Sequence, residues 1–171
     1  MRQRPGAPNS DFVQTCTVVE NWLHTHPELR TVAVYSPLPG EIDLAAILLR
    51  RPDLRWVYPR IRGHDLTFHT GESLTPGPFG ILEPAADAPE IPVHEIAAFL
   101  CPGLAFDRSG GRLGRGRGFY DRMLAKARPD ALKAGICFDS QIVPDTFPEP
   151  HDIPMDVILT GTSNIEALER P

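Results

Sequence analysis

The segment GRLGRGRGFYDR, residues 111–122, gathers the residue types in this sequence that are best suited to bind an anion. It holds four glycines, four arginines, an aromatic pair and Asp121. Glycines let backbone N–H groups converge on a phosphate, and the guanidinium forks of Arg115 and Arg117 match phosphate oxygens. A helix that starts near Gly118 would add the favourable field of its N-terminus. One interpretation of the segment is therefore a loop that wraps the phosphates of a nucleotide, with Asp121 holding the accompanying metal ion.

A second interpretation of the same residues is an exposed arginine-glycine segment with turn glycines and solvated arginines. The spacing matches neither GxGxxG nor GxxxxGK[ST], so neither a dinucleotide site nor a Walker loop is indicated. The glycine spacing alone leaves both interpretations open.

The charge of the chain narrows the class of ligand. The formal net charge is -5, which argues against broad nucleic-acid binding. Five arginines nevertheless fall within 15 residues: Arg108, Arg112, Arg115, Arg117 and Arg122. The expected target of this cluster is small and anionic. An RNA-binding module would need a basic domain with aromatic stacking partners, whereas aromatic residues make up 8% of the chain.

Length and composition predict one soluble domain. A chain of 171 residues with 42% hydrophobic and 23% charged residues lies in the ordinary globular range. We expect a loose N-terminus over residues 1–9 and a single α/β domain over residues 10–171. No apolar run approaches the roughly 18 residues that cross a bilayer, and the N-terminus lacks the apolar centre of a signal peptide. We therefore expect a cytoplasmic protein without a membrane partner. The three cysteines lack metal-site spacing and are expected to be buried.

The hydrophobic pattern predicts alternating strands and helices. Helical spacing covers DFVQTCTVVENWLHTH, EIDLAAILLRR and GFYDRMLAKA, while TVAVYSPL, RWVYPRI, LTFHT, IAAFLCPGLAF, KAGICF and DVILTGT read as strands. The stretch PGPFGILEP reads as a loop. Unbroken apolar strands favour a three-layer α/β fold, a mainly parallel, open, Rossmann-like sheet with helices on both faces. Ligands of such sheets bind outside the carboxyl ends of the strands, where SPLPGE and the arginine-glycine loop are both expected.

The segment PGLAFDRSGGRLGRGRGFYDRML resembles the signature of the 5-formyltetrahydrofolate cyclo-ligase family, also called methenyltetrahydrofolate synthetases. The stretches VYSPLPGEIDL, GPFGILEP and DSQIVPDTFPEPHDIPMDVILT match further landmarks of the family in order. The resemblance thus covers about residues 30 to 162, which is nearly the whole expected domain.

The resemblance implies that ATP and Mg²⁺ drive closure of 5-formyltetrahydrofolate to 5,10-methenyltetrahydrofolate, with release of ADP and phosphate. Such phosphoryl transfer depends on positioning and charge neutralisation more than on a protein nucleophile. The partners implied are small molecules, a reduced folate and ATP, with no nucleic acid. We expect a monomer or a weak homodimer.

The resemblance also implies roles for individual residues. The ATP-binding segment is Arg112, Leu113, Gly114, Arg115, Gly116, Arg117, Gly118, Phe119 and Tyr120. Catalytic roles fall to Arg115, Arg117 and Tyr120. The folate would contact Ser36, Glu41, Arg115, Gly116, Arg117, Gly118 and Phe119. Asp121 and Asp152 would hold the magnesium ion.

Structural alternatives stay open for four of these positions. Asp152 beside a proline also fits a turn or an N-cap, and Glu41 also fits the first turn of a helix. Either Phe119 or Tyr120 also fits the core. His151, next to Asp152, is expected to order its turn rather than to act as a base.

The chain departs from the family in two places. Family members begin with a helix that carries a Lys and an Arg toward the ATP phosphates and the folate, whereas SDFVQTCTVVENWLHTH has neither. Arg2 and Arg4 are the cations that precede it. The connection before AAFLCPGLAF is also shorter, with Pro89 and Pro92, where the folate tail would lie. These departures leave open a diverged family member that binds nucleotide or folate without this turnover.

Overall fold

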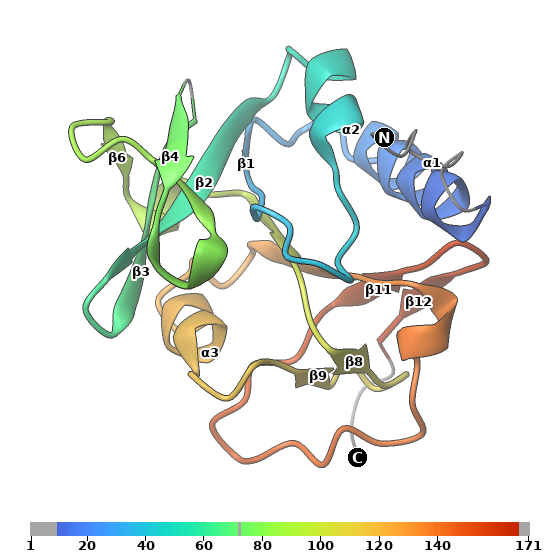
Figure 1. Ribbon diagram of the computed structural model, residues 1–171. Coiled ribbons are helices and arrows are strands. Elements are labelled where there is room, and N and C mark those ends of the chain that lie inside the picture. The colour runs from blue at the N-terminus through green and yellow to red at the C-terminus, as the bar shows by residue number, and fades with distance from the viewer. Residues whose placement is uncertain (1–9, 72, 168–171) are drawn as a thin grey trace, which may run out of the picture.

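The computed structural model describes residues 10–71 and 73–167, and Figure 1 shows their elements. The helices are α1 (Ser10–His24), α2 (Ala45–Arg50) and α3 (Phe119–Leu124), with 3₁₀ turns η1 (Pro78–Gly80), η2 (Val93–Glu95) and η3 (Asp139–Gln141). The strands are β1 (Thr31–Ala33), β2 (Arg55–Arg62), β3 (Asp65–Thr70), β4 (Leu74–Pro76), β5 (Leu82–Pro84), β6 (Glu90–Ile91), β7 (Ala98–Cys101), β8 (Ala105–Phe106), β9 (Arg112–Leu113), β10 (Leu132–Ile136), β11 (Val157–Leu159) and β12 (Asn164–Glu166). The N-terminus expected to be loose, residues 1–9, lies outside the described residues.

Eight strands form one open sheet in the order β12-β11-β10-β7-β1-β2-β3-β6. The five central strands, from β11 to β2, pair in parallel. The strands β12, β3 and β6 add antiparallel pairs at the two edges. The expected mainly parallel α/β sheet is confirmed.

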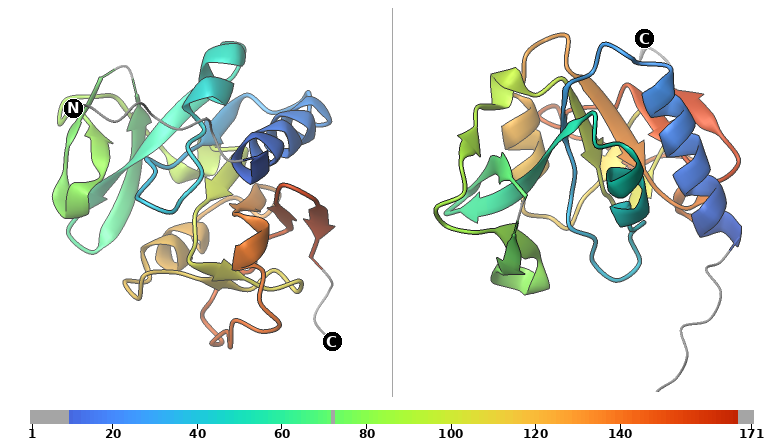
Figure 2. Two further views of the ribbon diagram at one scale, coloured as in Figure 1. Left: turned by 45° about the vertical axis from the view of Figure 1, so that its right-hand side comes forward. Right: turned by 90° about the horizontal axis from the view of Figure 1, so that it is seen from above.

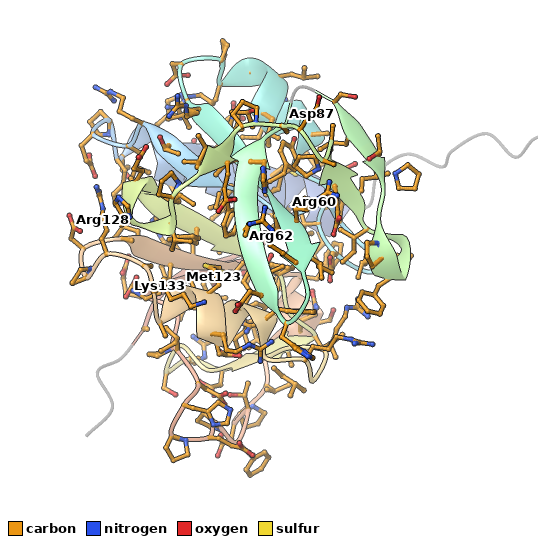
Figure 3. The ribbon with its side chains drawn as sticks, turned by 90° about the vertical axis from the view of Figure 1, so that its left-hand side faces the viewer. Arg60, Arg62, Asp87, Met123, Arg128 and Lys133 are labelled. Carbon is orange, nitrogen blue, oxygen red and sulfur yellow. The ribbon has the colours of Figure 1, made fainter. Side chains whose placement is uncertain are left out.

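Helices cover both faces of the sheet. Figure 1 shows α1 and α2 on one side and α3 on the other, and the turned views in Figure 2 agree. Neighbouring residues of a strand point to opposite faces, so Val32 packs with the α1 side while Ala33 packs with the α3 side. Met123 of α3 is buried against the second face (Figure 3). This two-sided burial explains why the central strands read as unbroken apolar runs.

The first helix follows from its apolar spacing. Cys16, Val19 and Leu23 are buried on one stripe of α1, and the helix ends at His24, shortly before Pro27. Burial raises the pKa of the Cys101 and Cys137 thiols to about 12, so both stay protonated at neutral pH. The expectation that the cysteines are buried is confirmed.

Two local predictions were wrong. The stretch predicted as the loop PGPFGILEP contains η1 and β5, and β5 pairs antiparallel with β4 in a small hairpin. Strands of three residues that each end in proline carry too little periodicity to be recognised. The run IAAFLCPGLAF is not one strand, because β7 ends before Pro102 and β8 pairs separately with β9. Proline cannot donate a ladder hydrogen bond, which ends the buried strand there.

None of the helices in the part of the chain that the structure describes is long and apolar enough to span a bilayer.

Candidate active site

A cavity of about 630 Å³ lies where the carboxyl ends of β1, β2 and β7 meet. Its volume is within the usual range of small-molecule sites, about 300–1,000 Å³. Five segments line it, within residues 35–41, 59–66, 79–83, 102–121 and 146–152. The SPLPGE loop and the arginine-glycine loop, expected at this edge of the sheet, therefore do share one cavity.

The arginine-glycine loop is ordered by its glycines. Gly116 and Gly118 have φ angles of 77° and 62°, a left-handed conformation that other L-residues seldom adopt. A Cβ atom on Gly114 would lie 2.9 Å from the Arg112 guanidinium. The loop connects β9 to α3, and its backbone conformation favours glycine at Gly116 and Gly118. The alternative of an exposed segment with turn glycines is met in part, because residues 115–117 are exposed, but Arg115 and Arg117 contact Glu41 and Phe79.

Arg112 and Asp121 form a largely buried ion pair in the cavity wall. Their side chains are 5% and 15% exposed, and Nη2 lies 3.2 Å from Oδ2. The guanidinium also lies over the Tyr120 ring, 5.1 Å from its centroid. The backbone N–H of Ile153 donates to Asp121 Oδ1 at 3.3 Å. Asp121 is thus held where α3 meets the segment that carries Asp152.

Asp152 lines the same cavity from the opposite segment. Its Oδ2 accepts a hydrogen bond from the backbone N–H of Glu149 at 2.8 Å, so the turn role expected as an alternative is present. His151 is exposed and lies 3.5 Å from Glu149 and 3.6 Å from Asp152. It therefore belongs to the turn, as expected. Among the described residues no three His, Cys, Asp or Glu side chains form a metal cluster. Two carboxylates nevertheless suit Mg²⁺, which keeps several waters.

Glu41 and Arg115 join the two loops across the cavity. Arg115 Nη2 lies 3.2 Å from Glu41 Oε1, and the Glu41 side chain is buried. The other carboxylate oxygen accepts from the backbone N–H of Leu38 at 2.8 Å. The buried Tyr35 hydroxyl donates to the Ile42 carbonyl at 2.8 Å, which fixes the base of this loop. Glu41 is therefore positioned before any substrate arrives.

Ser36 and Arg117 reach toward the β4–β5 hairpin. The Ser36 hydroxyl donates to the Leu82 carbonyl, so it is already engaged. The Arg117 guanidinium stacks on Phe79, 4.0 Å from the ring centroid. Phe79 itself has a φ of 60° and is exposed. The hairpin that the sequence pattern did not reveal thus forms one wall of the site.

The aromatic pair at the start of α3 serves both the cavity and the core. Phe119 and Tyr120 line the cavity and also pack against the α3-side core. Burial raises the pKa of the Tyr120 hydroxyl far above its ordinary value, so it keeps its proton at neutral pH. Tyr120 can therefore donate a hydrogen bond to a ligand but cannot act as a base. Leu113 lines the same wall and is exposed.

Comparison with known proteins decides the family. A model of the 5-formyltetrahydrofolate cyclo-ligase family matches residues 8–161. This chain belongs to the 5-formyltetrahydrofolate cyclo-ligase family.

Individual members of the cyclo-ligase family agree with this assignment. The 5-formyltetrahydrofolate cyclo-ligase of Mycolicibacterium smegmatis is 37% identical over 151 residues, which cover 81% of this chain and 77% of that protein. The Escherichia coli K12 cyclo-ligase is 31% identical over 155 residues, covering 81% of this chain and 83% of that protein. The NMR structure of Aquifex aeolicus 5,10-methenyltetrahydrofolate synthetase superposes with a TM-score of 0.77 at 28% identity, covering 92% of this chain and 84% of that one. The resemblance expected from residues 102–124 is confirmed.

Asp107 holds the cyclo-ligase site together and was not among the predicted residues. This buried carboxylate accepts hydrogen bonds from Ser109, Gly111 and Thr146. Burial alone would raise the pKa of Asp107, but these hydrogen bonds outweigh burial and hold the pKa far below its ordinary value. Asp107 thereby ties the approach to the glycine loop to the segment that carries Asp152. A buried Asp directly after an apolar strand was the signal available in the sequence.

Glu83 is a second residue that sequence reasoning missed. Its side chain lines the cavity although the residue is 3% exposed. Oε1 accepts from the backbone N–H of Ile61 at 2.9 Å, and no cation of the described residues forms an ion pair with it. Arg60, on the neighbouring strand β2, donates to the Pro84 carbonyl instead (Figure 3). The hairpin therefore brings to the cavity wall a carboxylate that has no ionic partner among residues 10–71 and 73–167.

Proposed function

We propose that this protein catalyses the ATP- and magnesium-dependent closure of 5-formyltetrahydrofolate to 5,10-methenyltetrahydrofolate, releasing ADP and phosphate. Membership of the cyclo-ligase family supports the reaction. The observation that carries the proposal is that the arginine-glycine loop and the Glu41 loop face one cavity and meet in the Arg115–Glu41 ion pair. One shared space is what direct transfer between two substrates requires.

The reaction proceeds in two bond exchanges. The formyl oxygen forms a bond to the γ-phosphorus while the bond to the bridging oxygen of ADP breaks. N10 then attacks the resulting imidate carbon and releases its proton, and the carbon–oxygen bond breaks with departure of phosphate. The protein needs no nucleophile of its own for these steps, since positioning and neutralisation of charge suffice.

The arginine-glycine loop receives the triphosphate. Backbone N–H groups between Gly114 and Gly118 contact its oxygens, and Arg115 and Arg117 neutralise the charge that moves during transfer. Tyr120 donates a hydrogen bond from its protonated hydroxyl to the bound ligand. Arg112 stays in the wall, where it orients Asp121. Leu113 and Phe119 shape the space beside the nucleotide.

The reduced folate lies on the Glu41 side of the cavity. Ser36 and Glu41 line the place of its pteridine ring, with the loop from Arg115 to Phe119 facing the reacting formyl group. Folate binding exchanges the Arg115–Glu41 pair for contacts of each side chain with a substrate. The two partners are therefore small molecules, a reduced folate and ATP.

Asp121 and Asp152 would hold the magnesium ion. Hard carboxylate oxygens from two segments of one cavity match its preference for oxygen ligands and for retained waters. The ion neutralises the phosphate oxygens of ATP when it is bound. In the protein without bound ligands, Arg112 neutralises the charge of Asp121.

A diverged member that binds ligands without turnover is the second candidate. The observation that favours it is the absence of Lys and Arg from α1, the helix on which the family carries phosphate-binding cations. Arg2 and Arg4, which precede α1, lie outside the described residues.

Turnover separates the two candidates. The assay follows the absorbance of methenyltetrahydrofolate formed from 5-formyltetrahydrofolate, with ATP or magnesium omitted in turn. Product that depends on both supports the cyclo-ligase proposal. Folded protein that binds ATP but forms no product supports the diverged member.

A further inference from the structure

Phe147 combines two features that do not stabilise the free protein. It is 82% exposed, so its ring buries little apolar surface. Its φ angle is 51°, in the left-handed region that an L-residue adopts only at a cost. The next residue is Pro148, and a residue before proline is further restricted toward extended conformations. A Gly or Asn would fit this backbone better than Phe.

The backbone beside Phe147 is held firmly in place. Thr146 donates to Asp107 through its backbone N–H at 3.0 Å and its hydroxyl at 2.6 Å. The backbone N–H of Phe147 donates to Asp145 Oδ1 at 2.7 Å. The ring is therefore presented from a fixed point while the ring itself is uncovered. Strain of this kind is a feature of ligand-binding sites, where neighbouring contacts maintain it.

Phe147 lines the cavity, in the same segment as the proposed metal ligand Asp152. Its segment continues to Asp152, and Asp107 ties that segment to Gly111, directly before Arg112. Figure 1 shows this loop beside the β8–β9 hairpin. The folate side, with Ser36 and Glu41, is bordered instead by the β4–β5 hairpin and its own exposed Phe79.

We propose that Phe147 is the stacking face for the adenine base of ATP. This inference rests on the proposed function, which brings a nucleotide to the neighbouring loop. A flat aromatic ring offers the base a face of matching shape, and such stacking gains its free energy only when the ligand is bound. The strained, exposed phenylalanine is thus retained for the ligand and not for the fold.

The test compares Phe147→Gly with wild-type protein by calorimetric titration of two probes, ATP and inorganic tripolyphosphate, both with magnesium. Tripolyphosphate has the phosphates but no base. We expect ATP to bind about 5- to 150-fold more weakly, the range for loss of one base stack. Tripolyphosphate affinity should be unchanged, and the Tm of the free protein should not fall, because glycine relieves the strained backbone.

Two further variants serve as controls. Phe147→Trp keeps an aromatic face and should retain the ATP affinity. Leu49→Ala removes an equally exposed apolar side chain from α2, outside the cavity lining, and should change neither ligand.

Three results would overturn the inference. The first two are unchanged ATP affinity in Phe147→Gly and an equal loss for ATP and tripolyphosphate. The third, measured by titrating 5-formyltetrahydrofolate as an additional probe, is a loss of folate affinity in place of ATP affinity. None of these readouts requires turnover. Absence of product from wild-type protein would contradict the proposed function, whereas unchanged ATP binding in Phe147→Gly would contradict only the stacking role.

Discussion

Substitution of Asp121 gives the sharpest test of the proposed metal site. The change Asp121→Asn keeps the size and an oxygen acceptor for Arg112 but removes the charge that attracts magnesium. We expect turnover at a fixed magnesium concentration to fall by about 100-fold or more, the scale of a lost charge-stabilising group. The Tm should also fall, because the buried Arg112 loses its ionic partner, so turnover is compared at a temperature where both proteins are folded. Asp65→Asn, which alters an exposed ion pair with Lys126, is the matched control. Full activity of Asp121→Asn would exclude this residue as the metal ligand.

Arg115 and Arg117 test the division of the cavity between the two substrates. Each arginine replaced by alanine should raise the KM for ATP more than the KM for folate, by about 10- to 150-fold if one charged hydrogen bond of about 1.5–3 kcal/mol is lost. Steady-state kinetics with each substrate varied in turn measures both values. Because Arg115 contacts Glu41 in the free protein, equal effects on the two KM values would assign it to the folate or the fold.

At the scale of elements, the hydrophobic spacing in the sequence predicted the amphipathic helix and the buried strands. The stripe of α1 and the buried runs of β1, β7, β10 and β11 carry strong patterns, and the structure contains them all. The β4–β5 hairpin and the β8–β9 pair have strands of two or three residues, which no periodicity reveals. Their positions follow from long-range hydrogen bonds such as Ser36 to Leu82. Phe79 and Glu83 were missed because they lie in the β4–β5 hairpin. Phe147 was missed because its place depends on the distant contact of Thr146 with Asp107.

The turns of the glycine loop and the start of the following helix were predictable from the sequence. The positive φ angles at Gly116 and Gly118 and the helix that begins at Phe119 match the expectation. The anchor of the loop was not predictable, because Asp107 accepts a hydrogen bond from Thr146, which lies 39 residues away in the sequence. Side-chain partners at that separation depend on the fold as a whole.

Because Asp107 must be ionised to stabilise this region, the free energy of unfolding should fall at acid pH. The pKa of Asp107 in the folded protein lies far below its value in the unfolded chain, about 3.9. Its contribution is therefore complete above about pH 5 and is lost as pH falls below about 4. Asp107→Asn should lower the free energy of unfolding by roughly 2 kcal/mol at pH 7, since hydrogen bonds to a charged group are lost.

Denaturant titrations at several pH values provide the measurement for Asp107. The difference in stability between wild-type and Asp107→Asn protein should shrink toward pH 3. Asp87→Asn, which alters an exposed carboxylate outside the cavity lining, is the control and should leave the stability nearly unchanged at every pH. A difference that stays constant from pH 7 to pH 3 would contradict the proposed charge state of Asp107.

At the scale of the whole molecule, we expect residues 10–171 to unfold as one cooperative unit. The sheet runs through the chain from β1 to β12, so local loss of one part would expose both core clusters. Magnesium and ATP at about 100 times Kd should raise the Tm by about 5–10 °C, because binding adds about 2.7 kcal/mol. Thermal scans by far-UV circular dichroism and tryptophan fluorescence test both points. Separate transitions, or no shift with ligand, would contradict them.

The association state belongs to the same scale. We expect a monomer or a weak homodimer. Sedimentation equilibrium across a range of concentrations measures it. A tight oligomer at low concentration would contradict this expectation.

The most direct test of the proposed reaction follows one oxygen atom. 5-Formyltetrahydrofolate labelled with ¹⁸O in the formyl group is converted with ATP and magnesium, and the released phosphate is analysed by mass spectrometry. Transfer of the γ-phosphoryl group to the formyl oxygen predicts one ¹⁸O in each phosphate for every methenyltetrahydrofolate formed. Unlabelled phosphate would show that ATP is hydrolysed by water, and direct transfer between the two substrates in this cavity would be wrong.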